Sequence, residues 1–271
     1  MNKHIISFIL CSAMCLQTMS GQEGSSAQSI TINMESDTVS VTVQAADQAF
    51  VDGQYSRAIQ MYQEIIATQG VSAGLYLNLG NAYFKTDNLA QALISYERAI
   101  LLDPTDQDVR FNLELARSKC VDKTTQPNML FITAWAKKIS RIMNVNQWGM
   151  AAIVFLTVAM ALICVYYILA PGRRGKGLCA WLFPIFILFS IMSWITAGQQ
   201  KRNISRHDYA IVTAPSVTVR STPSSQGTEI VIVHEGFKVK VEDKSSMKQW
   251  IEIKLEDGNV GWIEADMIEI I

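Results

Sequence analysis

The sequence predicts a multi-domain membrane protein that contains, in order, an all-α array of helical repeats, a transmembrane helical hairpin and a small all-β barrel. Three observations predict this fold class. Two long uncharged runs stand close together in the second half of the chain. The sequence before them repeats itself with a fixed period, and the sequence after them alternates apolar with polar side chains.

The two uncharged runs predict a pair of transmembrane helices. Residues 149–170 and 178–197 contain no charged side chain, and about 20 apolar residues are needed to cross the hydrocarbon core as a helix. Two buried helices of a soluble core are the alternative, but such helices rarely lack a charge over this length. The residues between the runs, 171–177, include Arg173 and Arg174. Basic loops favour the cytoplasmic side, but the outer flanks of the two runs are basic as well. Charge alone does not fix the orientation, and we expect a cytoplasmic loop here because of the N-terminal segment.

The N-terminal segment, 1–20, resembles a secretory signal peptide. Lys3 precedes a mostly apolar stretch, 5–16, that is too short to span a bilayer, and small residues stand near Ser20, where a signal peptidase would cleave. A lipidated cysteine is the alternative, but the residues before Cys11 and Cys15 are not small. Because two spans return the chain to the same side, an exported N-terminus places both soluble parts outside the cytoplasm.

The composition favours neither nucleic-acid binding nor catalysis. The net charge is −1, so no basic surface for nucleic acid is implied. Three histidines occur, and the chain has no nucleophile elbow, metal-ligand spacing or phosphate-binding loop. We therefore predict a protein without catalytic residues, metal or cofactor. Of the five cysteines only Cys120 falls in a predicted soluble segment, so no disulfide framework is expected.

The internal repeat is the most specific signal in the soluble sequence. The shift that maps Ala58 onto Ala92 also maps Tyr62 onto Tyr96, and a period of this length is typical of helix–turn–helix units. We expect the array at 39–119, after a flexible leader at 21–38, with its last helix as a cap. The second unit resembles the tetratricopeptide family at these positions: Tyr76, Leu79, Gly80, Tyr83, Ala92, Tyr96, Ala99 and Pro104. Gly80 and Ala92 are small where two helices are expected to cross closely.

The resemblance also implies a partner-binding surface. In tetratricopeptide arrays the first helix of each repeat lines the concave face, and by match these positions are Asp47, Phe50, Leu77, Asn78, Asn81, Phe84 and Asn112. The asparagine amides are suited to pair with the backbone of an extended peptide; solvated helix surface is the alternative. The lysines of the carboxylate-binding variant of the family are absent, so no clamp for a peptide C-terminus is predicted.

An amphipathic helix is predicted between the array and the first span, at 129–146. Phe131, Trp135 and Ile139 recur at helical spacing, with Lys137 and Lys138 on other faces. This pattern favours a helix that lies on the membrane surface. A helix packed against the repeat array is the alternative.

The tail, 207–271, predicts a small β-barrel. Apolar and polar residues alternate through short runs, and Asp257-Gly258 is expected to form a hairpin turn. The tail resembles the bacterial SH3 family in the following residues: Val217, Thr218, Val219, Arg220, Pro223, Gly236, Trp250, Gly261, Trp262 and Ile263. Trp250 and Trp262 form either a ligand surface or part of the barrel core. The acidic and aromatic loop with which signalling SH3 domains bind proline-rich peptides is not evident.

The order of segments as a whole resembles the BatE-type proteins of bacterial aerotolerance operons. The segment DVRFNLELARSK at 108–119, and a hairpin followed by the SH3-like tail, carry this resemblance. It implies a two-span protein of the bacterial inner membrane whose N- and C-terminal domains are periplasmic. It also implies von Willebrand A-domain membrane proteins and a MoxR-type ATPase as partners, in tolerance of oxidative stress.

Two functions are compatible with this organisation. The first is a non-enzymatic scaffold, in which the repeats hold a protein partner near the membrane and the barrel holds a second partner. The second is a wall-targeted protein, in which the barrel binds peptidoglycan and the repeats are incidental. Binding of peptidoglycan by the barrel alone would distinguish the second from the first.

Overall fold

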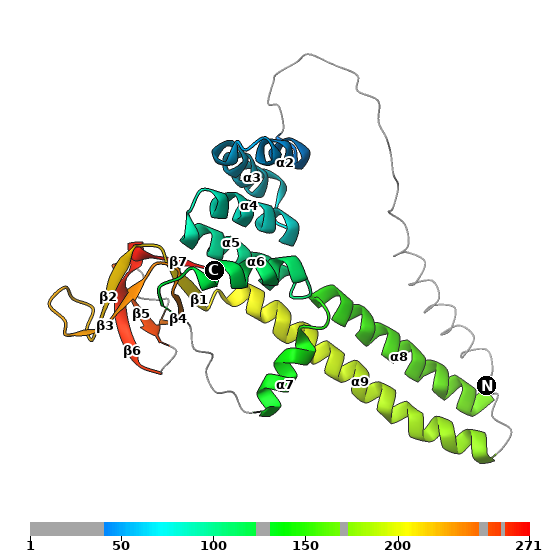
Figure 1. Cartoon of the computed structure of the whole chain (residues 1–271). Coiled ribbons are helices and arrows are strands. Elements are labelled where there is room, and N and C mark those ends of the chain that lie inside the picture. The colour runs from blue at the N-terminus through cyan, green and yellow to red at the C-terminus, as the bar shows by residue number, and fades with distance from the viewer. Residues whose placement is uncertain (1–40, 123–130, 169–172, 244–248, 256–257) are drawn as a thin grey trace, which may run out of the picture. The chain divides into compact units, whose positions relative to one another are not determined.

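The structure, a computed structural model of the chain, describes residues 41–122, 131–168, 173–243, 249–255 and 258–271 (Figure 1). These residues form an N-terminal region of paired helices, two long apolar helices and a C-terminal antiparallel β-sheet. The predicted signal peptide and the predicted leader, 21–38, lie outside the described residues.

The repeat region consists of two helical pairs followed by one helix. Its elements are α2 (Val43–Val51), α3 (Tyr55–Gln69), α4 (Ala73–Lys85), α5 (Leu89–Leu102) and α6 (Gln107–Ser118). Side chains cap several of the helices: the Oγ1 of Thr42 accepts from the Ala45 N–H, and the Oγ of Ser72 accepts from the Leu75 N–H.

The turns that join the two helices of each pair have the same backbone conformation at equivalent repeat positions. Gly53, with φ of 76°, follows α2, and Asp87, with φ of 57°, follows α4. These two positions are one repeat period apart in the sequence. A left-handed residue at this point reverses the chain between two antiparallel helices, and aspartate tolerates that conformation better than most residues. The predicted period is therefore present in the backbone as well as in the side chains.

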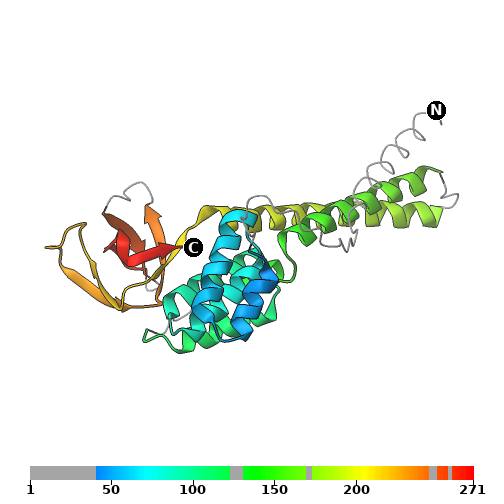
Figure 2. The ribbon, with the colours of Figure 1, turned by 90° about the horizontal axis from the view of Figure 1, so that it is seen from above.

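Two helices, α8 (Val145–Ile168) and α9 (Arg173–Arg206), are long and apolar enough to cross a membrane, with mean hydropathies of 2.5 and 2.2 over their apolar parts. Figure 2 shows them side by side. Small residues allow this approach, since Ala152 and Ala159 are buried and the hydroxyl of Ser190 donates to the Ala152 carbonyl at 2.9 Å.

The structure changes the predicted limits of these segments. Helix α9 begins at Arg173 and continues to Arg206, so it includes part of the predicted loop and the polar residues after Ala197. No proline lies between Ala197 and Arg206 to end the helix earlier. The predicted amphipathic helix is also shorter: α7 (Phe131–Ser140) ends before Asn144.

A pair of reciprocal hydrogen bonds explains why α7 and α8 are separate helices. The side chain of Asn144 accepts from the Gln147 N–H at 3.0 Å, while the Gln147 side chain accepts from the Asn144 N–H at 3.1 Å. This pair starts α8 as a new helix.

The C-terminal sheet contains seven antiparallel strands in the order β3-β2-β6-β5-β4-β1-β7. Their bounds are β1 (Tyr209–Val212), β2 (Ser216–Arg220), β3 (Glu229–His234), β4 (Lys238–Asp243), β5 (Trp250–Lys254), β6 (Val260–Glu264) and β7 (Ile268–Ile270). One face buries a core of branched aliphatic residues that includes Val219, Val239, Ile253 and Ile263. Closure of this sheet into a barrel remains a prediction.

The predicted turn between β5 and β6 lies partly outside the described residues, because Asp257 is not among them. Gly258 has φ of 91°, a conformation that favours glycine, and its N–H donates to the Leu255 carbonyl at 3.0 Å. The strands on either side pair from Trp250 with Glu264 to Lys254 with Val260.

Candidate functional site

A groove opens on the side of the array formed by the first helix of each repeat. It encloses about 290 Å³ and is lined by Phe50, Asn81, Phe84, Lys85, Tyr96, Asn112 and Leu115. These residues come from α2, α4, α5 and α6. Four of the seven predicted partner-binding residues therefore line one groove. The other three, Asp47, Leu77 and Asn78, are not among its lining residues.

The asparagines predicted to bind a peptide take part in a repeated hydrogen-bond ladder. The Tyr62 hydroxyl donates to Asp47 Oδ1 at 2.6 Å, and the Asn78 amide donates to the same oxygen at 3.0 Å. One repeat later, the Tyr96 hydroxyl donates to Asn81 Oδ1 at 2.8 Å, and Asn112 Nδ2 donates to it at 2.9 Å. The ladder joins the first helices of successive repeats.

The ladder corrects one premise of the sequence analysis. The amides of Asn78 and Asn112 are not free surface groups, since each already donates inside the array. Burial, followed by the hydrogen bond to Asp47 and its charge, raises the pKa of Tyr62, and burial raises that of Tyr96. Both hydroxyls therefore stay protonated donors at neutral pH. Substituting these asparagines would disturb the array, so binding of a peptide by their amides stays a prediction.

The ladder could have been found in the sequence. The triplet Asp47, Tyr62 and Asn78 maps onto Asn81, Tyr96 and Asn112 by the same shift that reveals the repeat. Buried polar residues that recur together at a structural period signal mutual hydrogen bonds.

The groove itself is apolar and basic. Phe50 packs edge-on against Tyr55 with 5.3 Å between ring centroids, and the Lys119 ammonium lies 4.1 Å from the Phe84 ring centroid. Lys85 and Leu115 also line the groove, and neither was predicted from the sequence. None of its described lining residues is acidic. A groove of this kind fits a peptide segment that presents apolar side chains beside an acidic one.

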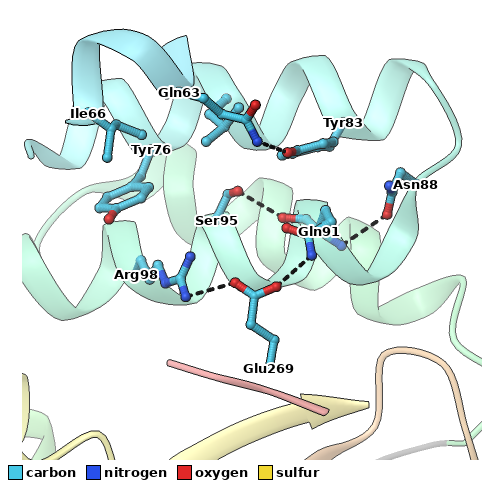
Figure 3. A pocket seen from close by; sticks show the side chains of 10 residues that line it. Gln63, Ile66, Tyr76, Tyr83, Asn88, Gln91, Ser95, Arg98 and Glu269 are labelled. Atoms are coloured by element: carbon cyan, nitrogen blue, oxygen red, sulfur yellow. Dashed lines mark hydrogen bonds and ion pairs between the residues drawn. The ribbon is translucent and has the colours of Figure 1, made fainter. Parts of the chain in front are cut away.

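A second cavity, of about 530 Å³, lies between the repeats and strand β7 (Figure 3). It is lined by Gln63, Ile66, Tyr76, Leu79, Tyr83, Asn88, Gln91, Ser95, Arg98 and Glu269. Its main polar groups pair with one another. Gln63 Nε2 donates to the Tyr83 hydroxyl at 2.7 Å, and Gln91 Nε2 donates to Glu269 Oε2 at 2.6 Å. This cavity lies at the contact between the repeats and the sheet.

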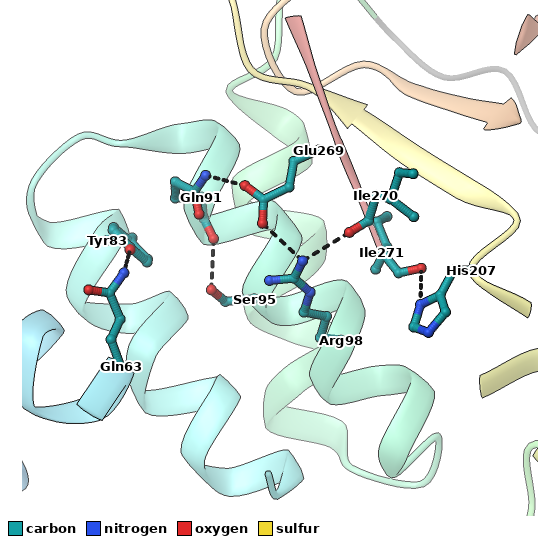
Figure 4. Close-up of polar contacts among 9 residues, drawn as sticks. All are labelled: Gln63, Tyr83, Gln91, Ser95, Arg98, His207, Glu269, Ile270 and Ile271. Carbon is teal, nitrogen blue, oxygen red and sulfur yellow. Dashed lines mark hydrogen bonds and ion pairs between the residues drawn. The ribbon is translucent and has the colours of Figure 1, made fainter. Parts of the chain in front are cut away.

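Strand β7 is held to α5 by Arg98. Its guanidinium donates to Glu269 Oε1 and to the Ile270 carbonyl, both at 2.9 Å (Figure 4). Figure 4 also shows His207 Nδ1 next to the Ile271 carbonyl, at 3.0 Å. Burial, and then the charge of Glu269, raises the pKa of Tyr83 in the wall of the cavity. The Tyr83 hydroxyl therefore remains a neutral group at physiological pH.

A buried carboxylate forms the centre of this contact. Glu97 of α5 is only 4% exposed; Lys238 of β4 donates to its Oε2 at 2.7 Å, and Arg117 of α6 donates to its Oε1. Burial alone would raise the pKa of Glu97, but the charges of Lys238 and Arg117 outweigh burial and lower it. Glu97 is therefore an ionised group that ties the sheet to the repeats.

The contact continues through tightly packed small groups. Gly236 has φ of 86°, and a Cβ added there would come within 2.7 Å of Cys120 Sγ and 2.8 Å of Leu93 Cδ1. Burial raises the pKa of the Cys120 thiol, although Arg117 partly opposes this. A neutral, half-buried thiol is a packing group rather than a reactive one.

The two candidate tryptophans lie outside the core of the sheet. Trp250 and Trp262 occupy positions that alternate with the buried Ile251, Ile253 and Ile263. In the register of β5 and β6, Trp250 pairs with Glu264 and Trp262 pairs with Glu252. Both rings are therefore half-buried on the outer face of the sheet, interleaved with two glutamates.

Comparison with known families supports the repeat assignment. Residues 73–106 match the family model of the tetratricopeptide repeat, and this segment contains all of α4 and α5. Among curated proteins no match to the chain is found. Within the described residues, no group of three or more His, Cys, Asp or Glu is arranged to hold a metal ion. A tetratricopeptide repeat indicates protein–protein interaction in general terms.

Proposed function

We propose that the protein is a non-enzymatic, membrane-anchored scaffold that binds a protein partner through the groove of its repeat array. The groove lined by Phe50, Phe84 and Leu115 is the observation that carries this proposal. Its lining combines apolar side chains with Lys85, and Lys119 lies over the Phe84 ring. These groups suit a partner segment with apolar and acidic side chains, and no reacting group is needed for such a role. The apolar helices α8 and α9 would hold the groove close to the membrane.

The finer assignment comes from the resemblance to BatE-type proteins. By that resemblance, the partners would be von Willebrand A-domain membrane proteins and a MoxR-type ATPase system, and the role would be tolerance of oxidative stress at the bacterial inner membrane. The SH3-like tail would hold a second partner. The repeats, the pair of apolar helices and the antiparallel tail occur in the order that this proposal requires.

A groove variant tests the scaffold. Phe84→Ala/Leu115→Ala removes two apolar anchors from the groove. If these are the main contacts of the interface, the loss should exceed about 2 kcal/mol, or roughly 30-fold in affinity. Crosslinking the full chain in intact membranes and identifying its partners by mass spectrometry should show the main partner depleted. The exposed Val71→Ala is the matched control and should leave the partner set unchanged.

The second candidate function is peptidoglycan binding by the outer face of the sheet. Trp250 and Trp262 lie together on that face, where rings can stack on a sugar or a peptide stem. If this is the function, Trp250→Ala/Trp262→Ala should abolish co-sedimentation with isolated peptidoglycan, and the groove variant should not. Loss of crosslinked partners in the tryptophan variant but not in the groove variant would replace the scaffold proposal with this one.

The proposed topology is tested independently of any partner. An even number of spans and an exported N-terminus place the repeats and the tail on the periplasmic side. Alkaline phosphatase fused after Lys119 or after Ile271 should therefore be active at both sites. Activity at only one site would contradict a two-span hairpin, and activity at neither would reverse the orientation.

A further inference from the structure

One end of the helix pair carries an unusual concentration of positive charge. Basic residues occur on both sides of the apolar runs at this end: Lys137, Lys138, Arg141, Lys201, Arg202 and Arg206. From Asp122 to Asp208 the sequence contains no other acidic residue. Asp208 lies two positions after Arg206, whereas the sequence places no carboxylate close to Lys138, Arg141, Lys201 or Arg202.

The structure brings the two basic segments together. Gln200 of α9 donates from Nε2 to the carbonyls of Ser140, at 3.3 Å, and Met143, at 3.2 Å. The indole N–H of Trp148 donates to the same Ser140 carbonyl at 3.2 Å. Because these bonds join the α7–α8 junction to α9, Arg141 and Lys201 lie at the same level along the helix pair.

These cations differ from two lysines of the β-sheet. Lys138, Arg141, Lys201 and Arg202 are exposed, and across the described ranges no carboxylate forms an ion pair with them. By contrast, Lys238 and its neighbour Lys240 are each paired with a glutamate. Burial, followed by the charges of Arg110 and Arg117, lowers the pKa of Arg141 and outweighs the opposing charge of Glu97. The cations of this level are therefore open to an outside anion.

Apolar side chains accompany the charges. Trp135 on α7 is 60% exposed, and Ile142, beside Arg141, is 63% exposed. Exposed apolar groups next to cations are typical of segments that sit at the boundary between headgroups and acyl chains. A soluble anion would leave these apolar groups in water, whereas a phospholipid would cover them.

We propose that the level defined by Lys138, Arg141, Lys201 and Arg202 binds the phosphates of anionic phospholipid headgroups. This inference rests on the proposed function only in requiring that α8 and α9 span the membrane. The headgroup phosphates supply the missing negative charge, and the acyl chains contact the exposed apolar side chains. Lipid binding would then hold the α7–α8 junction, and with it the repeat array, at a fixed height above the bilayer.

The test uses the full chain in detergent micelles, with phosphatidylglycerol or phosphatidylcholine of identical acyl chains added. Native mass spectrometry should show retention of phosphatidylglycerol and not of phosphatidylcholine. Each basic residue near an anionic surface contributes roughly five-fold to affinity, so Lys201→Gln/Arg202→Gln should reduce retention about 25-fold. Lys240→Gln/Lys254→Gln removes the same charge from the β-sheet and should retain the lipid like the unmodified chain.

The source of the phosphate is tested in the same assay. Glycerol phosphate and inorganic phosphate should not compete at the concentrations at which the lipid is retained; competition would show that the site takes a free phosphate, and would overturn the lipid assignment. Equal retention of the two lipids, or equal loss in both variants, would also overturn it. Extraction of the chain from membranes by alkaline carbonate would instead overturn the membrane anchoring itself.

Discussion

Lys238→Met is expected to lower the free energy of unfolding by about 3 kcal/mol, because it leaves Glu97 buried with one cation instead of two. Breaking a buried ion pair by removing one partner typically costs about 3–5 kcal/mol. We expect a loss at the low end of this range, because the Lys238 side chain is 27% exposed and Arg117 remains as a partner of Glu97. Urea denaturation of the full chain in detergent micelles, followed by tryptophan fluorescence, measures the change.

Lys240→Met is the matched control for this prediction. Lys240 is on the same strand and pairs with Glu242, but both side chains of that pair are more than a third exposed. Exposed pairs contribute about 0–1 kcal/mol, so the control should unfold close to the unmodified protein. If both variants lose stability equally, the charge cluster around Glu97 does not hold the sheet to the repeats.

The same cluster predicts a dependence on pH. The pKa of Glu97 is lowered in the folded protein, so its stabilisation is complete above the ordinary glutamate pKa of about 4.3 and is lost as the pH falls through the lower, folded value. Acid should therefore destabilise the unmodified chain in this window. Lys238→Met should show less of this dependence, because the pKa of Glu97 is then less depressed.

Gly80→Ala is the second substitution with a large expected effect. A Cβ at this position would lie 2.6 Å from Cε1 and 2.7 Å from Cδ1 of Tyr96. The ring cannot easily move, because Tyr96 is buried and its hydroxyl is bonded to Asn81. Overpacking typically costs about 1–3 kcal/mol, occasionally more, and an array of so few repeats has little stability to lose. The thermal midpoint should fall clearly.

Gly74→Ala, in the same helix, provides a control of opposite sign. Nothing lies within 4 Å of a Cβ added at Gly74, and replacing a helical glycine with alanine usually gains roughly 0.5–1 kcal/mol. The thermal midpoint should therefore stay the same or rise. A fall of similar size for both variants would mean that the close approach of α4 and α5 at Gly80 is not what limits the array.

Features that depend on local periodicity were predicted from the sequence. The repeat period identified the contact of Gly80 with the following helix, and alternation identified strands such as β4 and β5. The uncharged run 178–197 predicted the apolar part of α9, but it did not predict that the helix continues to Arg206. The residue after this helix, His207, has φ of 49°, a left-handed conformation that ends a helix and that the sequence pattern did not indicate.

The contact between the sheet and the repeats was not predicted. Glu97 and Lys238 are separated by 141 positions, and a charged residue in a helical pattern is ordinarily assigned to a solvated face. Such a long-range pairing leaves no periodic pattern in a single sequence. Leu115 of the groove could have been predicted, because it lies one repeat period after Asn81 and on the same helix as Asn112.

The hydrogen bonds from Arg98 to β7 can form only after the last strand of the chain has been synthesised. Arg98 and Gln91 are synthesised well before Glu269 and Ile270, and both apolar helices lie between them in the chain. The repeat helices can fold as they emerge, but the side of α5 that carries Glu97 stays uncovered until the tail has been made. If α8 and α9 span the membrane as proposed, a chain arrested during their insertion would expose Glu97 to proteases and chaperones, so that insertion and completion of the soluble fold would be coupled.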